Sequence, residues 1–563
     1  MKDSACGSSV PGHVSELVAD RGRWVVIVLQ AALVLLALRG GFLQIVRGEA
    51  YDRKQRRGTL SSRPTPAPRG KILTSDGLVL ACDLPRWIVP IDLQSAAGNP
   101  RKRSPEERRL RLQALLDEIL WTGPWAPCAP PGELLARALE RFDAGLRYLR
   151  LGVLHTQEER EDFLRWKATW EEQRGVRCFS PLEMRPRRAY PNGSLASQVV
   201  GNLRPDRTGG QWGIECAFDS ELRGVGGLRV LRCAGGGRLR AFDGSEAEGI
   251  LAIRGRDAVL TIRARIQAFL EELLVETREK WNASMVTGIV MDPRNGALLA
   301  LASAPLLGRE EFSTLYAGDP ALRAQLSLRR LQTTHVVMEP GSTIKPFVLG
   351  EALLAGLEPG RRVSPGGATR ILRRGRHTRV VHDSHDCGPV TLEEAVIHSS
   401  NIGMAEVGRL LGGERLRRAF ARFRFGEATG FELFEERGGV QDEARWKWDT
   451  TISTSFGYEL TVTPLQLARA YAAIANGGVL VTPHLIARLG GEAAPSPPTE
   501  RILPEAIAVR VREVLRRVVL EGTGSRLDGE EIGLAGKSGT AKKNRDGEYV
   551  DGLYVSSFIG FAP

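Results

Sequence analysis

The stretch Glu339–Phe347 reads EPGSTIKPF and places Ser342 three residues before Lys345. If a helix begins near Ser342, the serine hydroxyl and the lysine amine lie on one face and can share a hydrogen bond. Serine is a poor nucleophile at neutral pH, but a lysine that burial keeps neutral can take its proton. A serine and a lysine at this spacing also occur on the surface of many helices, so the match alone is a weak signal.

A second polar motif, Ser399-Ser400-Asn401, interrupts an apolar helical run from Leu392 to Leu411. That run opens with the capping box Thr391-x-x-Glu394. A buried polar turn is costly unless it has a task. The serine and the asparagine are suited to proton relay and to holding a substrate amide. The alternative interpretation is a helix-end cap.

A third motif, GKSGTA at Gly536–Ala541, lies in a strand-like segment. Gly539 is expected to let the backbone of a ligand approach the strand. Lys537, Ser538 and Thr540 offer a cation and two hydroxyls, which suit a carboxylate ligand.

In this order, S-x-x-K, S-x-N and K-S-G-T resemble the motif set of penicillin-binding proteins and serine β-lactamases. The resemblance to class B penicillin-binding proteins covers most of the chain from residue 24 onward. It is carried by Arg69-Gly70-x-Ile72, Asp76-Gly77, Leu80-Ala81, Arg188–Pro191, Gly213–Glu215, Leu222–Gly224, Leu260–Ile262, Gln267, Ser455–Tyr458 and Val462–Ala468. Thr74, Ser75 and Arg263 depart from the family pattern, and Ser538 replaces its commoner threonine.

The resemblance implies a peptidoglycan D,D-transpeptidase that β-lactams acylate. Ser342 would attack the carbonyl between the terminal D-alanines of a stem peptide, with Lys345 as its base. Ser399 would help shuttle the proton, and Asn401 and Lys345 would keep the site connected. The N–H groups of Ser342 and Thr540 would form the oxyanion hole. Lys537, Ser538, Gly539 and Thr540 would bind the terminal carboxylate. No metal or other cofactor is implied.

The segments Lys537–Lys543, Asp546-Gly547-x-Tyr549 and Ser557–Pro563 are more similar to division-specific than to elongation-specific enzymes. The partner implied is a polytopic glycosyltransferase of the division type, together with other division membrane proteins. Three alternatives stay open: an elongation or sporulation transpeptidase, a β-lactam sensor or β-lactamase, and a non-catalytic division scaffold.

An apolar stretch, Trp24–Leu38, is too short for a hydrocarbon core of about 30 Å unless it continues through Arg39 to Val46. We therefore predict an uncleaved transmembrane helix over 24–46. A cleavable signal peptide is the alternative, with Gly48 and Ala50 imitating its cleavage site. Arg39 either snorkels to the headgroups or meets a polar group of a partner helix.

Charge counting leaves the orientation of this helix open. The substrate of the resembling family lies outside the cytoplasm, which places residues 1–23 inside. The resemblance thus implies a single-pass protein of the bacterial inner membrane with an extracytoplasmic catalytic domain.

The fold class we predict is α+β and multidomain. A pedestal of the dimerisation type is expected over 47–258, followed by a transpeptidase domain over 259–563 with an antiparallel sheet flanked by helices, as in serine β-lactamases. Residues 99–178 have a mostly helical pattern that includes the cap Thr156-x-x-Glu159, and 188–255 has a pattern of strands and turns. A helix over Ile262–Trp281 and a hairpin with its turn at Asn295-Gly296 begin the last domain.

Composition argues against two other classes of function. The net charge of +12 raises the question of nucleic acid, but no zinc-finger spacing, aromatic stacking platform or phosphate loop accompanies it. The basic surface more simply faces anionic lipid or wall polymer.

The seven cysteines have no C-x-x-C spacing, so that one or two disulfides are possible but a dense framework is not expected. The cluster His382–Cys387 resembles a set of metal ligands without a defined geometry.

The last segment, Ser556–Pro563, reads as a strand. In the resembling family another strand and a final helix follow, and that strand lies between this one and the strand containing Gly288–Met291. We therefore expect a truncated domain in which these two strands are separated by a gap or each present an open edge.

Overall fold

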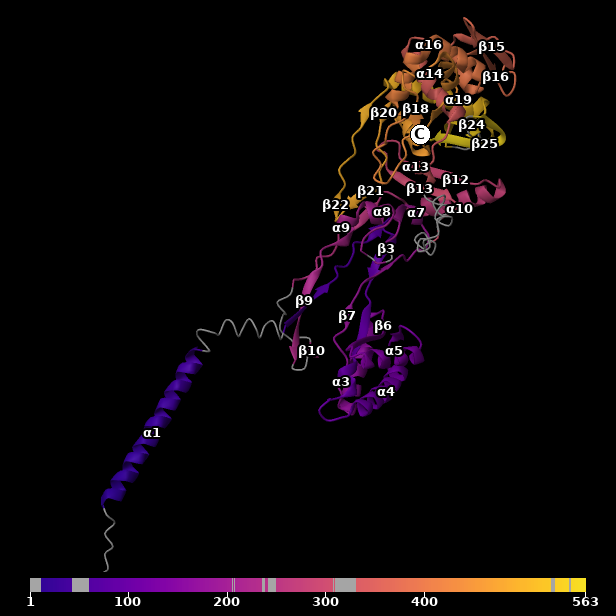
Figure 1. Cartoon of the computed structure of the whole chain (residues 1–563). Helices are drawn as coiled ribbons and strands as arrows, with labels where there is room; N and C mark the ends of the chain where they lie inside the picture. The colour runs from indigo at the N-terminus through magenta and orange to yellow at the C-terminus, as the bar shows by residue number, and fades with distance from the viewer. Residues whose placement is uncertain are drawn as a thin grey trace, which may run out of the picture. The chain divides into compact units, whose positions relative to one another are not determined.

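The structure is a computed structural model that describes residues 12–42, 60–204, 206, 208–234, 238–240, 250–306, 308, 331–527, 532–545 and 548–562 (Figure 1). It divides into two compact units. The first comprises Met1–Pro66, Pro85–Arg185 and Gly226–Ala252, and the second comprises Ala67–Leu84, Pro186–Val225 and Ile253–Pro563. The domain bounds expected at 47–258 and 259–563 stay predictions.

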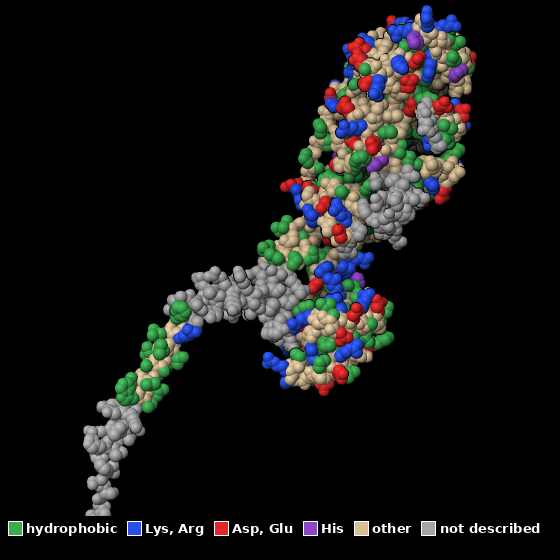
Figure 2. All heavy atoms as spheres, viewed as in Figure 1, with side chains coloured by type: hydrophobic (Ala, Val, Ile, Leu, Met, Phe, Trp, Pro, Cys, Tyr) green, Lys and Arg blue, Asp and Glu red, His purple; other side chains and the backbone are tan. Residues whose placement is uncertain are grey.

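The N-terminal helix α1 spans Gly12–Gly41. Its segment Trp24–Gly41 has a mean hydropathy of 2.0, none of it is buried, and it is long and apolar enough to cross a membrane. Figure 2 shows hydrophobic side chains along this stretch. Residues 43–46 of the predicted membrane span lie outside the described part of the chain.

The first unit is built on the sheet β5-β6-β4-β7. Its two long strands, β4 (Trp87–Asp92) and β6 (Tyr148–Leu154), are antiparallel, and the short strands β5 (Ala126–Pro127) and β7 (Glu183–Met184) flank them. The helices α4 (Pro105–Thr122), α5 (Pro131–Asp143) and α6 (Gln157–Arg174) belong to the same unit. The predicted cap of α6 is confirmed, because the side chain of Thr156 accepts a hydrogen bond from the N–H of Glu159.

The second unit brings together three segments that resemble the family pedestal. Arg69 donates to Glu215 (Nε to Oε2, 2.6 Å), and so does Arg188 (Nε to Oε1, 2.6 Å). Arg69 also donates to Asp219 at 2.7 Å. Glu215 is fully buried, so that its charge depends on these two guanidinium groups. A six-stranded sheet of this unit has the order β22 (Glu492–Ala493), β21 (Ile486–Leu489), β11 (Ala258–Leu260), β2 (Ile72–Leu73), β3 (Val79–Leu84), β8 (Arg187–Ala189).

Two predicted elements begin the catalytic part of this unit. Helix α10 spans Ala264–Lys280, and the strands β12 (Val286–Met291) and β13 (Leu298–Ala304) form an antiparallel hairpin. The turn at Asn295-Gly296 is confirmed, since Gly296 has a φ of +85° and the N–H of Ala297 donates to the Asn295 side chain. Asp76 accepts from the N–H of Ala264 at the start of α10, despite the departures at Thr74, Ser75 and Arg263.

Strand β24 (Ala535–Arg545) pairs antiparallel with β25 (Glu548–Phe561), and the register places Lys537 opposite Ile559. In the described part of the chain, β24-β25 and β12-β13 remain separate two-stranded sheets, and Ile559 does not pair with Ile289. The separation agrees with the open edges expected from the sequence. Strand β25 begins earlier than the predicted strand at Ser556.

The sequence predicts only strands and turns over 188–255, but the structure also has helices there. Three short helices occur there, at Ser197–Val200 (α7), Gly213–Ala217 (α8) and Asp219–Arg223 (α9). Each is four or five residues long, which is too short for a helical period to stand out in the sequence. Glycines follow two of them and stop the helix: Gly201 with φ +75° and Gly224 with φ +69°.

Candidate active site

Ser342 lies in a tight turn that the surrounding chain holds in place. Gly341–Ile344 form a 3-10 helix, η2, which leads directly into α14 (Lys345–Leu354). The N–H of Gly341 donates to the carbonyl of Gly457 at 3.0 Å. The hydroxyl of Tyr471 donates to the carbonyl of Thr343 at 2.8 Å. The predicted helix start near Ser342 is therefore present, and Ser342 itself is only partly buried.

The amine of Lys345 is fully buried at the base of this turn. It donates to the carbonyl of Ser399 at 2.6 Å, to Oδ1 of Asn401 at 2.9 Å and to Oγ of Ser399 at 3.3 Å. Among the described residues no hydrogen bond joins it to Ser342, so the direct contact that we expected from the sequence is not made. The three donors of the ammonium group are instead directed to the S-x-N turn.

Burial lowers the pKa of Lys345 well below its usual value, and the positive charge of Lys537 lowers it further. Asp383 acts in the opposite direction. A lysine whose charged form is disfavoured in this way can accept a proton at neutral pH.

The S-x-N motif occupies the break between α15 (Leu392–Ile397) and α16 (Asn401–Arg422). The break and the capping box Thr391–Glu394 are both as predicted. Ser399 has a φ of +61°, a left-handed conformation that is unusual for a serine and directs its side chain toward the two lysines.

The carboxylate of Asp383 holds the start of α16. It accepts from Oγ of Ser400 at 2.6 Å, from the N–H of Ile402 at 3.0 Å and from the N–H of Asn401. These N–H groups belong to the first turn of the helix, where no helical carbonyl is available to them. Asp383 therefore fixes the backbone that carries Ser399 and Asn401.

Lys537 approaches the same serine from strand β24. Its Nζ donates to Oγ of Ser399 at 3.0 Å, to the carbonyl of Ser538 at 3.0 Å and to Oγ1 of Thr523 at 3.4 Å. Its side chain is fully buried, and this burial lowers its pKa to about 7. Oγ of Ser538 donates to Oγ1 of Thr523 at 3.0 Å, so Thr523 connects two motif residues.

Gly539 packs closely against the turn that carries Ser342, and its expected role in letting a ligand approach stays a prediction. A side-chain carbon placed on it would lie 2.8 Å from Cγ2 of Thr343 and 3.0 Å from the carbonyl oxygen of Pro340. The absent side chain lets β24 pack against the turn that carries Ser342. Thr540, the next residue, is exposed.

The structure thus brings the three motifs together. Hydrogen bonds connect Lys345, Ser399, Asn401 and Lys537. Ser342 lies on the turn η2, and Ser538, Gly539 and Thr540 lie on strand β24 beside Lys537. Sequence reasoning missed Asp383 and Thr523. Asp383 belongs to the cluster that resembled a metal site, and Thr523 stands in Gly522-Thr523-Gly524, for which no motif gave a signal.

The resemblance of His382–Cys387 to metal ligands has a structural explanation. Among the described residues, no three His, Cys, Asp or Glu side chains are grouped to hold a metal ion. Asp386 accepts from the N–H groups of Gly367 and Gly388, and His382 contacts Thr369 at 3.0 Å. The described cysteines, Cys82, Cys128, Cys178, Cys216 and Cys387, are free thiols.

Comparison with known proteins agrees with this geometry. Residues 286–563 match the family described as the penicillin binding protein transpeptidase domain, and residues 64–257 match the penicillin-binding protein dimerisation domain.

Two curated relatives and one solved structure extend over nearly the whole chain. The probable peptidoglycan D,D-transpeptidase PenA of Neisseria meningitidis is 29% identical over 562 residues, covering 98% of this chain and 87% of the relative. The stage V sporulation protein D of Bacillus subtilis is 26% identical over 573 residues, covering 97% of this chain and 80% of the relative. A chain from a peptidoglycan synthase complex is 26% identical with a TM-score of 0.65, covering 96% of this chain and 92% of that chain.

One assignment follows from three findings. The two family matches stand in the expected order, the relatives align along nearly the full length of the chain, and the three motifs meet around Ser399. The chain belongs to the class B penicillin-binding proteins, serine acyltransferases with a pedestal and a transpeptidase domain.

Proposed function

We propose that this chain cross-links peptidoglycan stem peptides outside the cytoplasm, at the division septum, through an acyl-enzyme on Ser342. The observation that carries the proposal is the fully buried amine of Lys345, whose lowered pKa suits a base and which hydrogen-bonds both polar residues of the S-x-N turn.

In the first step, Oγ of Ser342 attacks the carbonyl carbon between the two terminal D-alanines, and its proton passes to Lys345. The N–H groups of Ser342 and Thr540 stabilise the oxyanion. The C–N bond then breaks, D-alanine leaves with a proton delivered through Ser399, and an ester remains on Ser342. The amine of a second stem peptide attacks that ester and releases Ser342 as its hydroxyl.

The donor peptide is held by its terminal carboxylate at Lys537, with Ser538, Gly539 and Thr540 along the same strand. A cation with two hydroxyls suits a carboxylate because charge-assisted hydrogen bonds are shorter and stronger than neutral ones. β-Lactams, which mimic the donor, acylate the same serine. Asn401 holds the amine of Lys345 and the substrate amide.

The septal role rests on the resemblance of Lys537–Lys543, Asp546–Tyr549 and Ser557–Pro563 to division-type enzymes. In this proposal, α1 spans the inner membrane with residues 1–23 in the cytoplasm. The partner is a polytopic glycosyltransferase of the division type. A fluorescent fusion that concentrates at midcell supports the septal role, whereas a signal along the side wall contradicts it.

Labelling with a fluorescent penicillin tests the chemical step. The native chain is expected to be labelled, Ser342→Ala is expected to lose all labelling, and Ser220→Ala, a substitution at an exposed serine of the pedestal, is expected to be labelled as the native chain. Labelling that survives Ser342→Ala contradicts the mechanism. Rapid release of hydrolysed drug by the native chain would instead indicate a β-lactamase.

A further inference from the structure

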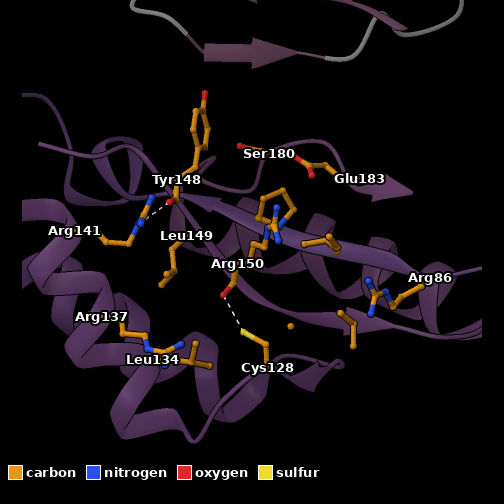
Figure 3. Close-up of a pocket in the computed structure, with 14 residues that line it drawn as sticks. Arg86, Cys128, Leu134, Arg137, Arg141, Tyr148, Leu149, Arg150, Ser180 and Glu183 are labelled. Carbon is orange, nitrogen blue, oxygen red and sulfur yellow. Dashed lines mark hydrogen bonds between the residues drawn. The ribbon is translucent and has the colours of Figure 1, made fainter. Parts of the chain in front are cut away.

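The first compact unit contains a hollow of about 650 Å³ on one side of its sheet (Figure 3). Ile88 and Pro90 of β4 line it, while their neighbours Val89 and Ile91 pack into the hydrophobic cores. Because successive side chains of a strand alternate between faces, the hollow lies on the face opposite those cores.

Positive charge dominates the hollow. Four arginines line it against one glutamate, Glu183. Arg137 and Arg141 come from α5, Arg150 comes from β6, and Arg86 stands just before β4. In Figure 3 these arginines are distributed around the hollow and do not lie along one edge.

The described residues neutralise this charge only in part. Arg137 pairs with Glu133 on the exposed side of α5, and Arg141 donates its Nε to the carbonyl of Tyr148 at 3.1 Å. Neither Arg141 nor Arg150 forms an ion pair with a residue that the structure describes. Like charges that converge on a concave surface repel one another, and a bound anion relieves that repulsion.

The floor of the hollow decides which kind of anion fits. The half-buried side chains of Leu149 and Val153 form an apolar floor, beside which Ile88 and Leu134 are almost fully buried. A phosphate polymer would cover the arginines and leave this apolar floor wet. A peptide that alternates carboxylate and apolar side chains satisfies both, since guanidinium groups bind carboxylates in pairs of hydrogen bonds.

We propose that this hollow is a docking site for an extended acidic segment of a partner protein, with carboxylates at Arg141 and Arg150 and an apolar side chain against Leu149 and Val153. Its volume falls within the range of about 300 to 1,000 Å³ that is typical of ligand pockets, which suits a few residues of an extended chain. The site is separate from the acyl-transfer chemistry and does not depend on it.

Binding of a defined peptide tests this proposal on the full chain in detergent micelles. The probe is a fluorescein-labelled decapeptide of alternating glutamate and valine, and fluorescence anisotropy reports its Kd. We expect the double variant Arg141→Glu with Arg150→Glu to weaken binding tenfold or more. The native affinity should also fall as salt is added.

Arg165→Glu is the matched control, because Arg165 is an exposed arginine of α6 outside the hollow, and it should bind as the native chain does. Circular dichroism and thermal unfolding of the double variant check that it is folded. Equal binding by the double variant, or equal binding of a decapeptide with glutamine in place of glutamate, overturns the proposal. So does inorganic polyphosphate that binds the same arginines more tightly than the peptide.

Discussion

At the scale of single residues, two buried lysine amines converge on the hydroxyl of Ser399. Lys345 and Lys537 donate to its Oγ at 3.3 and 3.0 Å. Each amine loses hydration on burial, and each therefore has a lowered pKa. The two lysines have opposite tasks in the proposed mechanism, because one must be neutral to act as a base and the other charged to bind a carboxylate.

Replacing Lys345 with alanine removes the proposed base. General base catalysis typically contributes roughly 100-fold to 10,000-fold, so the acylation rate constant with a fluorescent penicillin should fall by that factor. Lys280→Ala, at an exposed position, serves as control and should acylate at the native rate. Near-native acylation by Lys345→Ala would remove this residue from the base role.

The pKa of Lys537, about 7, predicts a pH dependence. As pH rises through that value, Lys537 loses its charge in the free enzyme, so kcat/KM for carboxylate-bearing β-lactams should decline above about pH 7. On the acidic side, kcat/KM should fall as Lys345 becomes protonated. In Lys537→Arg the cation persists at alkaline pH. A pH profile of acylation with the same alkaline limb in this variant would exclude Lys537 as its origin.

Asp383 is a positioning residue whose replacement should affect the S-x-N turn. Asp383→Ala leaves the N–H groups of Asn401 and Ile402 without their acceptor, which costs about 1 to 3 kcal/mol of stability. The acylation rate should fall at least about tenfold, because Ser399 and Asn401 shift.

Asp386→Ala is the matched control, since Asp386 also accepts backbone N–H bonds, from Gly367 and Gly388, but does not touch the turn. Thermal unfolding and acylation kinetics measure the two effects separately. A variant of Asp383 that is destabilised yet acylates at the native rate would mean a purely structural role.

From the sequence we could predict the site residues that lie close to one another along the chain. Ser342 and Lys345 lie in one turn, and the S-x-N motif is visible because it interrupts an apolar helix. The sequence could not predict that Lys345 donates to Asn401, 56 positions away, or that Thr523 contacts Lys537. Such contacts are set by how α14, α16 and β24 pack together.

At the scale of elements, the hairpin β24–β25 forms one wall of the site and is fastened to the nucleophile turn. Tyr549 of β25 donates to Glu339 at 2.8 Å, three residues before Ser342, and Glu339 also accepts from the N–H of Glu459. Burial raises the pKa of the Glu339 carboxyl. The hairpin is therefore held by a hydrogen bond from β25 to the segment before η2 as well as by the pairing of β24 with β25.

Gly539→Ala tests that close contact. The added carbon would be 2.8 Å from Thr343, tighter than real side chains allow, so β24 must move away from the turn. We expect acylation to slow about tenfold or more while the protein stays folded. Gly360→Ala, where no atom lies within 4 Å of the added carbon, should acylate normally. Native kinetics in Gly539→Ala would show that the contact is not required.

At the scale of the whole molecule, residues far apart in sequence meet in a buried ion network. Glu215 lies 146 positions from Arg69 and 27 from Arg188 and binds both. In the sequence, these residues stood out only because their segments resemble those of class B penicillin-binding proteins. Their contact could not be derived from the sequence, because no local pattern records which charges will be buried together.

Glu215→Ala would remove the buried carboxylate that Arg69 and Arg188 share and leave them only Asp219 and Asp83, which costs about 3 to 5 kcal/mol. Thermal unfolding should show a large drop in Tm. Glu492→Ala, which breaks the exposed pair with Arg256, should change stability by less than about 1 kcal/mol. If both variants unfold at the same temperature, the network does not stabilise this unit.

The two amines that meet at Ser399 also constrain where its own hydrogen can point. A hydroxyl oxygen has two lone pairs and one proton. While both lysines donate to it, both lone pairs are occupied, so the O–H bond turns outward, away from the amines. Once Lys345 is neutral, its nitrogen offers a lone pair and the O–H bond can turn inward. The hydroxyl of Ser399 thus behaves as a rotor whose orientation reports the charge on its neighbour.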